Sequence, residues 1–125
     1  MLLCVSLFLL GFAACEATAD PYVTYDARSF MFGGKRDIIL SGALHYPRIP
    51  HGDWAAVMEH ARELGLNTIQ TYVFWSFHQP NSPNETNWSG QADLAKFVST
   101  AGAAGLNVVV RIGPYACAEY NFGAI

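Results

Sequence analysis

The stretch DWAAVMEHARELGLNTIQTYVFW, residues 53–75, decides the fold class. Apolar residues recur in its first half at the i, i+3, i+4 and i+7 spacing of one helix face: Trp54, Val57, Met58, Ala61 and Leu64. We therefore expect a helix over Asp53–Leu64, with Gly65 as its C-terminal stop. The second half, Thr68–Trp75, is β-branched and aromatic and predicts a buried strand.

The same pattern occurs a second time further along the chain. The tripeptide at residues 65–67, Gly-Leu-Asn, recurs at residues 105–107, and each copy joins a predicted helix to a predicted strand. The second helix is expected over Ala92–Ala104 and its strand over Asn107–Ile112. Upstream, Asp37–Leu44 is another strand candidate, and Phe30–Phe32 with Gly33-Gly34 indicates a short strand and a turn.

The order strand, helix, strand, helix, strand predicts an α/β protein with a parallel sheet. Helical repeats and solenoids have similar periods, but the β-branched strands argue against them. The periodicity leaves open a doubly wound sheet and a (β/α)₈ TIM barrel. No Gly-x-Gly-x-x-Gly follows a strand, so the nucleotide-binding version has no support. A complete barrel takes about 250 residues, so this chain would hold the first three strands and two helices of one, preceded by a short strand and turn.

Composition narrows the class of protein. The 125 residues include 7 basic and 10 acidic side chains, for a net charge of −3, and 52% are hydrophobic. A nucleic-acid-binding protein normally has a basic face, so no nucleic-acid partner is expected. A chain this apolar has ample surface to bury, so disorder is not expected either.

Residues 1–19 have the layout of a secretory signal peptide. An apolar run over 2–14 is followed by the small residues Ala17 and Ala19, just before Asp20. The run is short for a membrane span, so no stable membrane anchor is expected, although a buried helix or an anchor is the alternative interpretation. Removal of this segment would leave residues 20–125 with Cys117 as the only thiol, either buried and free or paired with a cysteine elsewhere.

Two successive triplets match the N-glycosylation pattern: Asn84-Glu85-Thr86 and Asn87-Trp88-Ser89. Both lie in the polar, turn-rich stretch 79–90, which we expect to be a surface loop. Each triplet is a weak signal alone, but both agree with export of the protein.

Aromatic and hydrogen-bonding side chains follow the ends of the three expected strands, where parallel α/β proteins place their chemistry. Such a surface suits a sugar, because rings pack on its C–H face while polar groups bind its hydroxyls. These residues are His45, Tyr46 and Arg48, then Tyr72, Trp75, Phe77, His78 and Gln79, then Arg111, Tyr115, Cys117, Glu119, Tyr120 and Asn121.

For several of these residues, a purely structural role is the alternative interpretation. Trp75 and Phe77 are equally consistent with core packing, and Arg48 and Arg111 are expected to pair with carboxylates as structural partners. No metal site is expected, because the histidines have no ligand at a typical spacing. Nothing marks a base for Cys117 as a nucleophile.

A glycosidase normally uses two carboxylates, one as acid/base and one as nucleophile or base. Only Glu119 comes just after a strand end among polar neighbours. The other carboxylates belong to the helices, precede the first strand or lie in the 79–90 stretch. One well-placed carboxylate cannot perform this two-carboxylate reaction.

The chain resembles glycoside hydrolase family 35, the β-galactosidases, of the plant type. The segments that carry the resemblance span almost the whole of residues 20–125: VTYD at 23–26, GGKR at 33–36, SGALHYPR at 41–48, QTYVFW at 70–75 and RIGPYACAE at 111–119. The resemblance implies a secreted (β/α)₈ hydrolase that removes terminal non-reducing β-D-galactose from galactosides or galactose-containing glycans with retention of configuration, without a cofactor. It implies an extracellular location in the apoplast or cell wall, with the vacuole as an alternative.

In the family, residues matching Tyr72, Cys117, Ala118 and Glu119 line the galactose subsite, and Glu119 would hold sugar hydroxyls. The resemblance places both catalytic glutamates further along, after the fourth and seventh strands. We therefore expect no catalytic residue in this chain and no activity from it alone. A truncated, non-catalytic galactose-binding fragment and an incomplete gene model are the alternatives.

The chain departs from the family pattern at four positions. Gln79 stands where Glu is usual, which removes a charge and is expected to weaken hydroxyl binding. Tyr120 replaces Trp but keeps an aromatic face, Ala124 replaces a second Gly, and Ala27 replaces a frequent His.

Overall fold

The computed structural model describes residues 22–125, so the predicted signal peptide at 1–19 lies outside the described residues. The described chain divides after Ile38 into two compact units. The first comprises three short strands, and the second contains a parallel sheet with its helices.

The first unit is an antiparallel meander of β1 (Val23–Tyr25), β2 (Phe30–Phe32) and β3 (Lys35–Arg36), in that order. Its second turn depends on Gly33 and Gly34, whose φ angles of 54° and 79° lie in the left-handed region that favours glycine. The expected short strand and glycine turn are confirmed, whereas β1 and β3 were not predicted. All three strands are too short to give a period-two signal, and β2 was indicated by its phenylalanines and the glycine turn that follows them.

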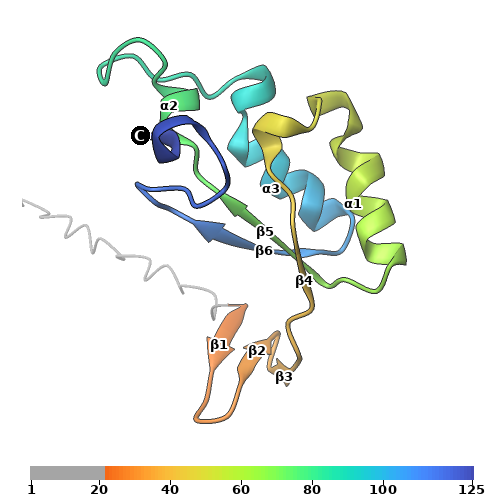
Figure 1. The fold of residues 1–125 in the computed structure, drawn as a ribbon. Coiled ribbons are helices and arrows are strands. Elements are labelled where there is room, and N and C mark those ends of the chain that lie inside the picture. The colour runs from red at the N-terminus through yellow and green to blue at the C-terminus, as the bar shows by residue number, and fades with distance from the viewer. Residues whose placement is uncertain (1–21) are drawn as a thin grey trace, which may run out of the picture. The chain divides into compact units, whose positions relative to one another are not determined.

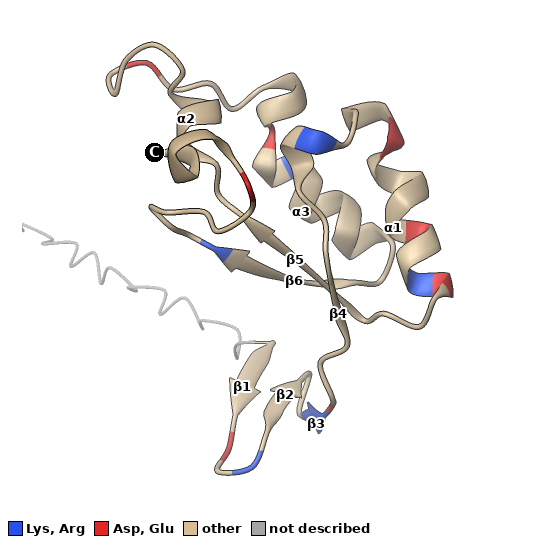
Figure 2. Ribbon diagram, in the orientation of Figure 1, with Lys and Arg blue, Asp and Glu red and all other residues tan. Residues whose placement is uncertain are grey.

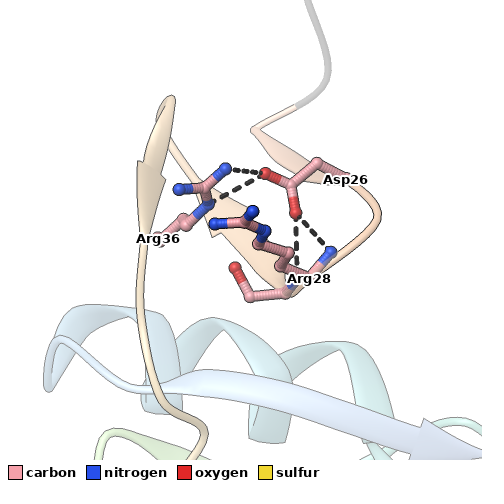
Figure 3. Close-up of polar contacts among 4 residues, drawn as sticks. Asp26, Arg28 and Arg36 are labelled. Atoms are coloured by element: carbon pink, nitrogen blue, oxygen red, sulfur yellow. Dashed lines mark hydrogen bonds and ion pairs between the residues drawn. The ribbon is translucent and has the colours of Figure 1, made fainter.

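Asp26 closes the first turn of this meander and links it to β3 (Figure 3). One carboxylate oxygen accepts hydrogen bonds from the backbone N–H groups of Arg28 and Ser29, at 2.8 and 2.9 Å. The other oxygen accepts from the Arg36 guanidinium, with Nε at 2.8 Å. The Arg36 hydrogen bonds, followed by the two backbone bonds, lower the pKa of the Asp26 carboxyl below its usual value.

The second unit is built on a parallel sheet of β4 (Ser41–Ala43), β5 (Thr68–Tyr72) and β6 (Asn107–Arg111), in that order. Helices α1 (Trp54–Glu63) and α3 (Leu94–Ala103) connect the strands and pack against each other (Figure 1). The predicted α/β class and the parallel order are therefore confirmed. The two long helices lie within two residues of their expected bounds. Four 3₁₀ turns complete the unit: η1 (Tyr46–Arg48), η2 (His51–Asp53), η3 (Gly90–Ala92) and η4 (Asn121–Ala124).

The strand expected over residues 37–44 is wrong in its first half, since β4 begins only at Ser41. Leu40 is joined to the start of β5 by one side-chain and two backbone hydrogen bonds, outside the regular strand ladder. Its N–H donates to Oδ1 of Asn67 at 2.9 Å, and its carbonyl accepts from the N–H groups of Asn67 and Thr68. The side-chain amide oxygen of Asn67 thus accepts the hydrogen bond that a backbone carbonyl would accept in a regular strand pair.

The strand expected over residues 68–75 ends early, at Tyr72, and a short helix α2 (Trp75–His78) follows. The N–H of Phe74 donates to the hydroxyl of Tyr46 at 3.1 Å, so this backbone donor finds its partner outside the sheet. The third strand ends at Arg111, one residue before the expected end, and the carbonyl of Ile112 accepts from Nε1 of Trp75 at 2.8 Å.

The core lies where the two helices meet the sheet. Phe97 of α3 packs edge-on against Trp54 of α1, with ring centroids 5.3 Å apart. Both rings are buried, as are Met58 and Ile69. Strand β6 lies at the edge of the sheet, and Val109 and Val110 are exposed.

Charged residues lie mainly on helices and loops (Figure 2). Strands β4 and β5 carry none, and β6 ends in Arg111. Within residues 22–125, no helix combines the length and the apolar character needed to cross a membrane.

Candidate functional site

Residues that follow the three parallel strands meet at one edge of the sheet. The register places Ala43 beside Gln70 and Tyr72 beside Arg111, so the carboxyl ends of β4, β5 and β6 are adjacent. The ring of His45, just after β4, lies 6.0 Å from the ring of Tyr72. Clefts at this edge of α/β sheets commonly bind ligands. We call the side chains of His45, Arg48, Tyr72, Arg111 and Glu119, which follow or end the three strands, the edge cluster.

Tyr72 presents little of its ring to solvent. Its side chain is buried, and the guanidinium carbon of Arg111 lies 4.0 Å from the ring centroid. This cation–π contact covers one face of the ring. Within residues 22–125 the Tyr72 hydroxyl makes no hydrogen bond.

The expectation that Arg48 and Arg111 pair with carboxylates is wrong for residues 22–125. Arg111 packs on Tyr72 and forms no ion pair with a described carboxylate. Arg48 instead donates from Nη2 to the backbone carbonyl oxygens of Ala118 and Glu119, the latter at 3.0 Å. A guanidinium can satisfy two carbonyl groups at once because its donors are planar and fixed in direction.

The Arg48 contacts fix the backbone of the segment that follows β6. Glu119 has a φ of 50°, a conformation that non-glycine residues adopt at an energetic cost. Its side chain and that of Cys117 are exposed, whereas Ala118 is half-buried. Within residues 22–125 the Cys117 thiol is unpaired and exposed, so of the two alternatives the buried thiol is wrong, whereas pairing with a cysteine elsewhere is untested.

Phe74 joins this segment to Tyr72. The ring of Tyr120 lies 4.9 Å from that of Phe74, which in turn contacts Tyr72 at 6.3 Å. Of the four residues expected to line a sugar site (Tyr72, Cys117, Ala118 and Glu119), Ala118 and Glu119 are held by Arg48. Tyr72 is connected through Phe74 to Tyr120, the residue that follows Glu119.

His45 carries a buried polar atom without a partner. Its Nδ1 is inaccessible and forms no hydrogen bond. Burial, followed by the positive charges of Arg48 and Arg111, lowers the pKa of His45 below its ordinary value of 6.5. The imidazole is therefore neutral near pH 7, so it adds no charge to the two guanidinium groups beside it.

A buried polar network behind the edge cluster was not predicted from the sequence. Tyr46 Oη and His78 Nε2 lie 2.6 Å apart, and His78 Nδ1 lies 2.8 Å from the carbonyl oxygen of Asn87. A carbonyl only accepts, so Nδ1 carries the proton and Nε2 accepts from the Tyr46 hydroxyl. Burial raises the pKa of Tyr46 to about 12. No periodic signal could reveal a contact between residues so far apart in the chain.

His78 is fully buried and uses both ring nitrogens in this network, which leaves neither for a metal ion. Within residues 22–125, no group of three or more histidine, cysteine or acidic side chains could hold a metal. Trp75 and Phe77, whose roles were open, are both half-buried. Gln79 donates from Nε2 to the carbonyl of Pro83 at 3.0 Å, a bond that an ionised glutamate could not make.

A hollow of about 480 Å³ lies where α2 and η4 approach each other. Its lining combines aromatic rings with amide side chains, including Phe77, Tyr120, Phe122, Asn87, Gln91 and Asn121. The edge cluster itself offers one carboxylate, that of Glu119. This chemistry suits binding of hydroxyl groups better than paired acid/base catalysis.

Comparisons with known proteins place these features in a family. The model of glycosyl hydrolases family 35 matches residues 29–125. The chain is 48% identical over 101 residues to beta-galactosidase 8 of Arabidopsis thaliana, covering 81% of this chain and 12% of that protein. It is 43% identical over 101 residues to probable beta-galactosidase 2 of Dictyostelium discoideum, covering 81% of this chain and 13% of that protein. The chain thus spans about an eighth of the length of these curated relatives.

A solved structure agrees on the fold. The crystal structure of beta-galactosidase from the psychrophilic Marinomonas ef1 superposes with a TM-score of 0.55 at 20% identity, over 66% of this chain and 12% of that one. On the extent of the family match and on its identity to two curated relatives, this chain belongs to glycosyl hydrolase family 35.

Proposed function

We propose that the protein is a retaining β-galactosidase that removes terminal non-reducing β-D-galactose from β-D-galactosides. In this proposal, β4, β5 and β6 are the first three strands of a (β/α)₈ barrel. Tyr72, Cys117, Ala118 and Glu119 line part of its galactose site. The supporting observation is that Arg48 binds the backbone of Ala118 and Glu119 at the same sheet edge where Arg111 packs on Tyr72.

Two polar side chains of this site, those of Glu119 and Tyr72, would bind different hydroxyls of the sugar. The exposed Glu119 carboxylate accepts hydrogen bonds from two neighbouring sugar hydroxyls, since it has two acceptor oxygens. The Tyr72 hydroxyl, free of other described partners, donates to or accepts from a third. Because Arg111 covers one face of the ring, Tyr72 contributes through its hydroxyl and not by stacking.

The proposed role of residues 22–125 is binding and not proton transfer. Retaining hydrolysis needs a second carboxylate as nucleophile beside the acid/base. Glu119 is the one carboxylate in the edge cluster, and the resemblance assigns it to substrate hydroxyls. The two-carboxylate reaction requires no cofactor.

Export is part of the proposal. It rests on the layout of residues 1–19 and on the acceptor triplets at Asn84 and Asn87. Both asparagines are exposed in the loop between α2 and η3. We propose that the protein is secreted and glycosylated, and that it acts on galactose-containing glycans outside the cell.

A chimera tests the activity. The segment of Arabidopsis thaliana beta-galactosidase 8 that matches this chain is replaced by the present sequence, and hydrolysis of a chromogenic β-galactoside is measured. We expect turnover by the chimera and none by the 125-residue chain alone. A folded chimera without turnover, or turnover by the purified chain, would contradict the proposal.

Single substitutions in the chimera test the binding residues. Glu119→Gln and Tyr72→Phe each remove hydrogen bonds to substrate, and each is expected to lower kcat/KM by about tenfold or more, equivalent to about 1.4 kcal/mol. Glu85→Gln, on the exposed loop, is the matched control and should leave kcat/KM unchanged. Equal values for all three variants would remove Tyr72 and Glu119 from the site.

A further inference from the structure

The two acceptor triplets lie side by side in the sequence but differ in how they are held. Asn84-Glu85-Thr86 is exposed and has only local contacts. The N–H of Asn84 donates to Oγ of Ser82 at 3.2 Å, and the N–H of Glu85 donates to the Ser82 carbonyl at 3.1 Å. Within residues 22–125, no hydrogen bond or ion pair joins this triplet to the core, although it borders the same hollow as His78.

The second triplet is fastened to a fully buried residue. The N–H of Asn87 donates to the carbonyl of His78 at 2.8 Å, and its own carbonyl accepts from His78 Nδ1 at 2.8 Å. The indole of Trp88 stacks on the His78 ring, with centroids 3.9 Å apart and planes at 26°. Trp88 also meets Trp75 edge-on at 6.3 Å. We call these contacts the His78 clasp.

The acceptor side chain is engaged as well. Oδ1 of Asn87 accepts from both the N–H and the Oγ–H of Ser89, at 3.0 and 2.8 Å. The backbone N–H and carbonyl of Asn87 are therefore both bonded to His78, and its Oδ1 is bonded to Ser89. An enzyme that must draw the triplet into its own binding groove would have to open the His78 clasp first.

The order of residues in the chain lets the clasp form early. Tyr46 and His78 both precede Asn87, so every partner has been synthesised when Trp88 emerges. Closing a loop of about ten residues takes on the order of 10–100 ns. Addition of one residue takes on the order of 0.1 s. Loop closure is therefore not limiting for the contacts among Trp75, His78, Asn87 and Trp88.

From this contrast we infer that Asn84 is the glycan acceptor and that the His78 clasp keeps Asn87 unmodified. The reaction uses a lipid-linked oligosaccharyl diphosphate as donor. A bond forms between Nδ2 of Asn84 and C1 of the sugar, the bond from C1 to the diphosphate breaks, Nδ2 loses a proton, and the lipid diphosphate leaves. This inference rests on the proposed export of the protein.

Site-resolved mass spectrometry tests the inference. The 125-residue chain is expressed in eukaryotic secretory cells, with its own N-terminus and, in parallel, with an established signal peptide in place of residues 1–19. Glycans are removed by peptide N-glycosidase in heavy-oxygen water, which marks the asparagine that carried them. The mark is expected on Asn84 alone, and Ser89→Ala should leave it unchanged.

Two further variants test whether the His78 clasp is the reason that Asn84 is glycosylated and Asn87 is not. Thr86→Ala should abolish the glycan without transferring it to Asn87. Combined with His78→Ala, which removes both the ring that stacks on Trp88 and the donor to the Asn87 carbonyl, it should yield a glycan on Asn87. A mark on Asn87 in the wild type or in Thr86→Ala, or no gain in the double variant, would overturn the inference, as would an unmarked Asn84 behind the established signal peptide. A glycan that appears only behind that signal peptide counts against the proposed export and supports the choice of Asn84.

Discussion

The hydroxyl of Tyr46 and Nε2 of His78 lie 2.6 Å apart, and neither side chain is accessible to solvent. The same hydroxyl accepts from the N–H of Phe74 at 3.1 Å. One oxygen atom thus satisfies a buried ring nitrogen and a buried backbone donor. It also joins the exit of β5 to the loop after β4.

Tyr46→Phe is therefore expected to destabilise the second unit by about 1–3 kcal/mol, because it leaves two buried polar groups unsatisfied while it keeps the ring. Urea unfolding followed by tryptophan fluorescence measures this difference. Tyr115→Phe is the matched control, since Tyr115 is exposed and its hydroxyl forms no hydrogen bond within the described residues. Equal unfolding midpoints for the two variants would argue against the network.

His45 gives the stability of the second unit a dependence on pH. Its pKa is lowered in the folded state by burial and by Arg48 and Arg111, so folding favours the neutral ring. As the pH falls below the ordinary value of 6.5, the unfolded chain binds the proton more readily than the folded one. The free energy of unfolding therefore decreases toward acid pH and is fully recovered above that value.

His45→Gln is expected to remove this part of the acid sensitivity. Unfolding free energies at about pH 5 and about pH 8 would differ less in the variant than in the wild type. His60→Gln is the control, because His60 is an exposed residue of α1. An unchanged pH dependence in the His45 variant would show that the ring does not titrate differently in the two states.

The sequence predicted the helices well because their apolar face depends on local spacing alone. Trp54, Met58 and Ala61 occur at the helical period and are all buried in α1. The strands were predicted too long for a different reason. The side chains of Asn67 and Tyr46 bond to backbone N–H groups of Leu40 and Phe74, and these bonds accompany the ends of regular pairing. A side-chain atom that takes the place of a backbone acceptor leaves no signature in hydrophobic periodicity.

The sequence predicted where the candidate site residues lie along the strands, but not which groups they contact. Placing Tyr72 and Arg111 at strand ends follows from the parallel order of the sheet. The role of Arg48 could not be predicted, because its acceptors are backbone carbonyls some 70 residues away. A carboxylate was the expected partner of Arg48, whereas its observed acceptors are main-chain carbonyls. The positions of these carbonyls depend on the conformation of the loop after β6.

Arg48 should stabilise the loop that carries Cys117 and Glu119. Arg48→Ala is expected to cost about 1–3 kcal/mol, typical of hydrogen bonds from a charged donor, and to accelerate amide hydrogen exchange over residues 116–123. For Arg48→Lys, both the stability and the exchange rate should lie between those of the wild type and of Arg48→Ala, because an ammonium lacks the planar pair of donors. Lys96→Ala, on the exposed face of α3, is the control. Unchanged exchange in Arg48→Ala would mean that the loop holds its conformation without the guanidinium.

Asp26 offers a local test of electrostatics in the first unit. Its pKa is lowered mainly by the Arg36 hydrogen bonds, so the carboxylate stabilises the meander above the ordinary value of 3.8 and loses this effect as the pH falls through the lower, folded value. The amide protons of Arg28 and Ser29, both bonded to Oδ1, should report this titration by NMR with a midpoint below 3.8.

Asp26→Asn should abolish this titration, since an amide does not ionise in this range. It keeps an oxygen for the two backbone donors but turns an NH₂ group toward Arg36, so the meander should also be less ordered than in the wild type. Arg36→Gln keeps the carboxylate while it removes the charged donor, and the midpoint should then move up toward 3.8. A midpoint that stays in place in Arg36→Gln would assign the lowered pKa to the two backbone bonds instead.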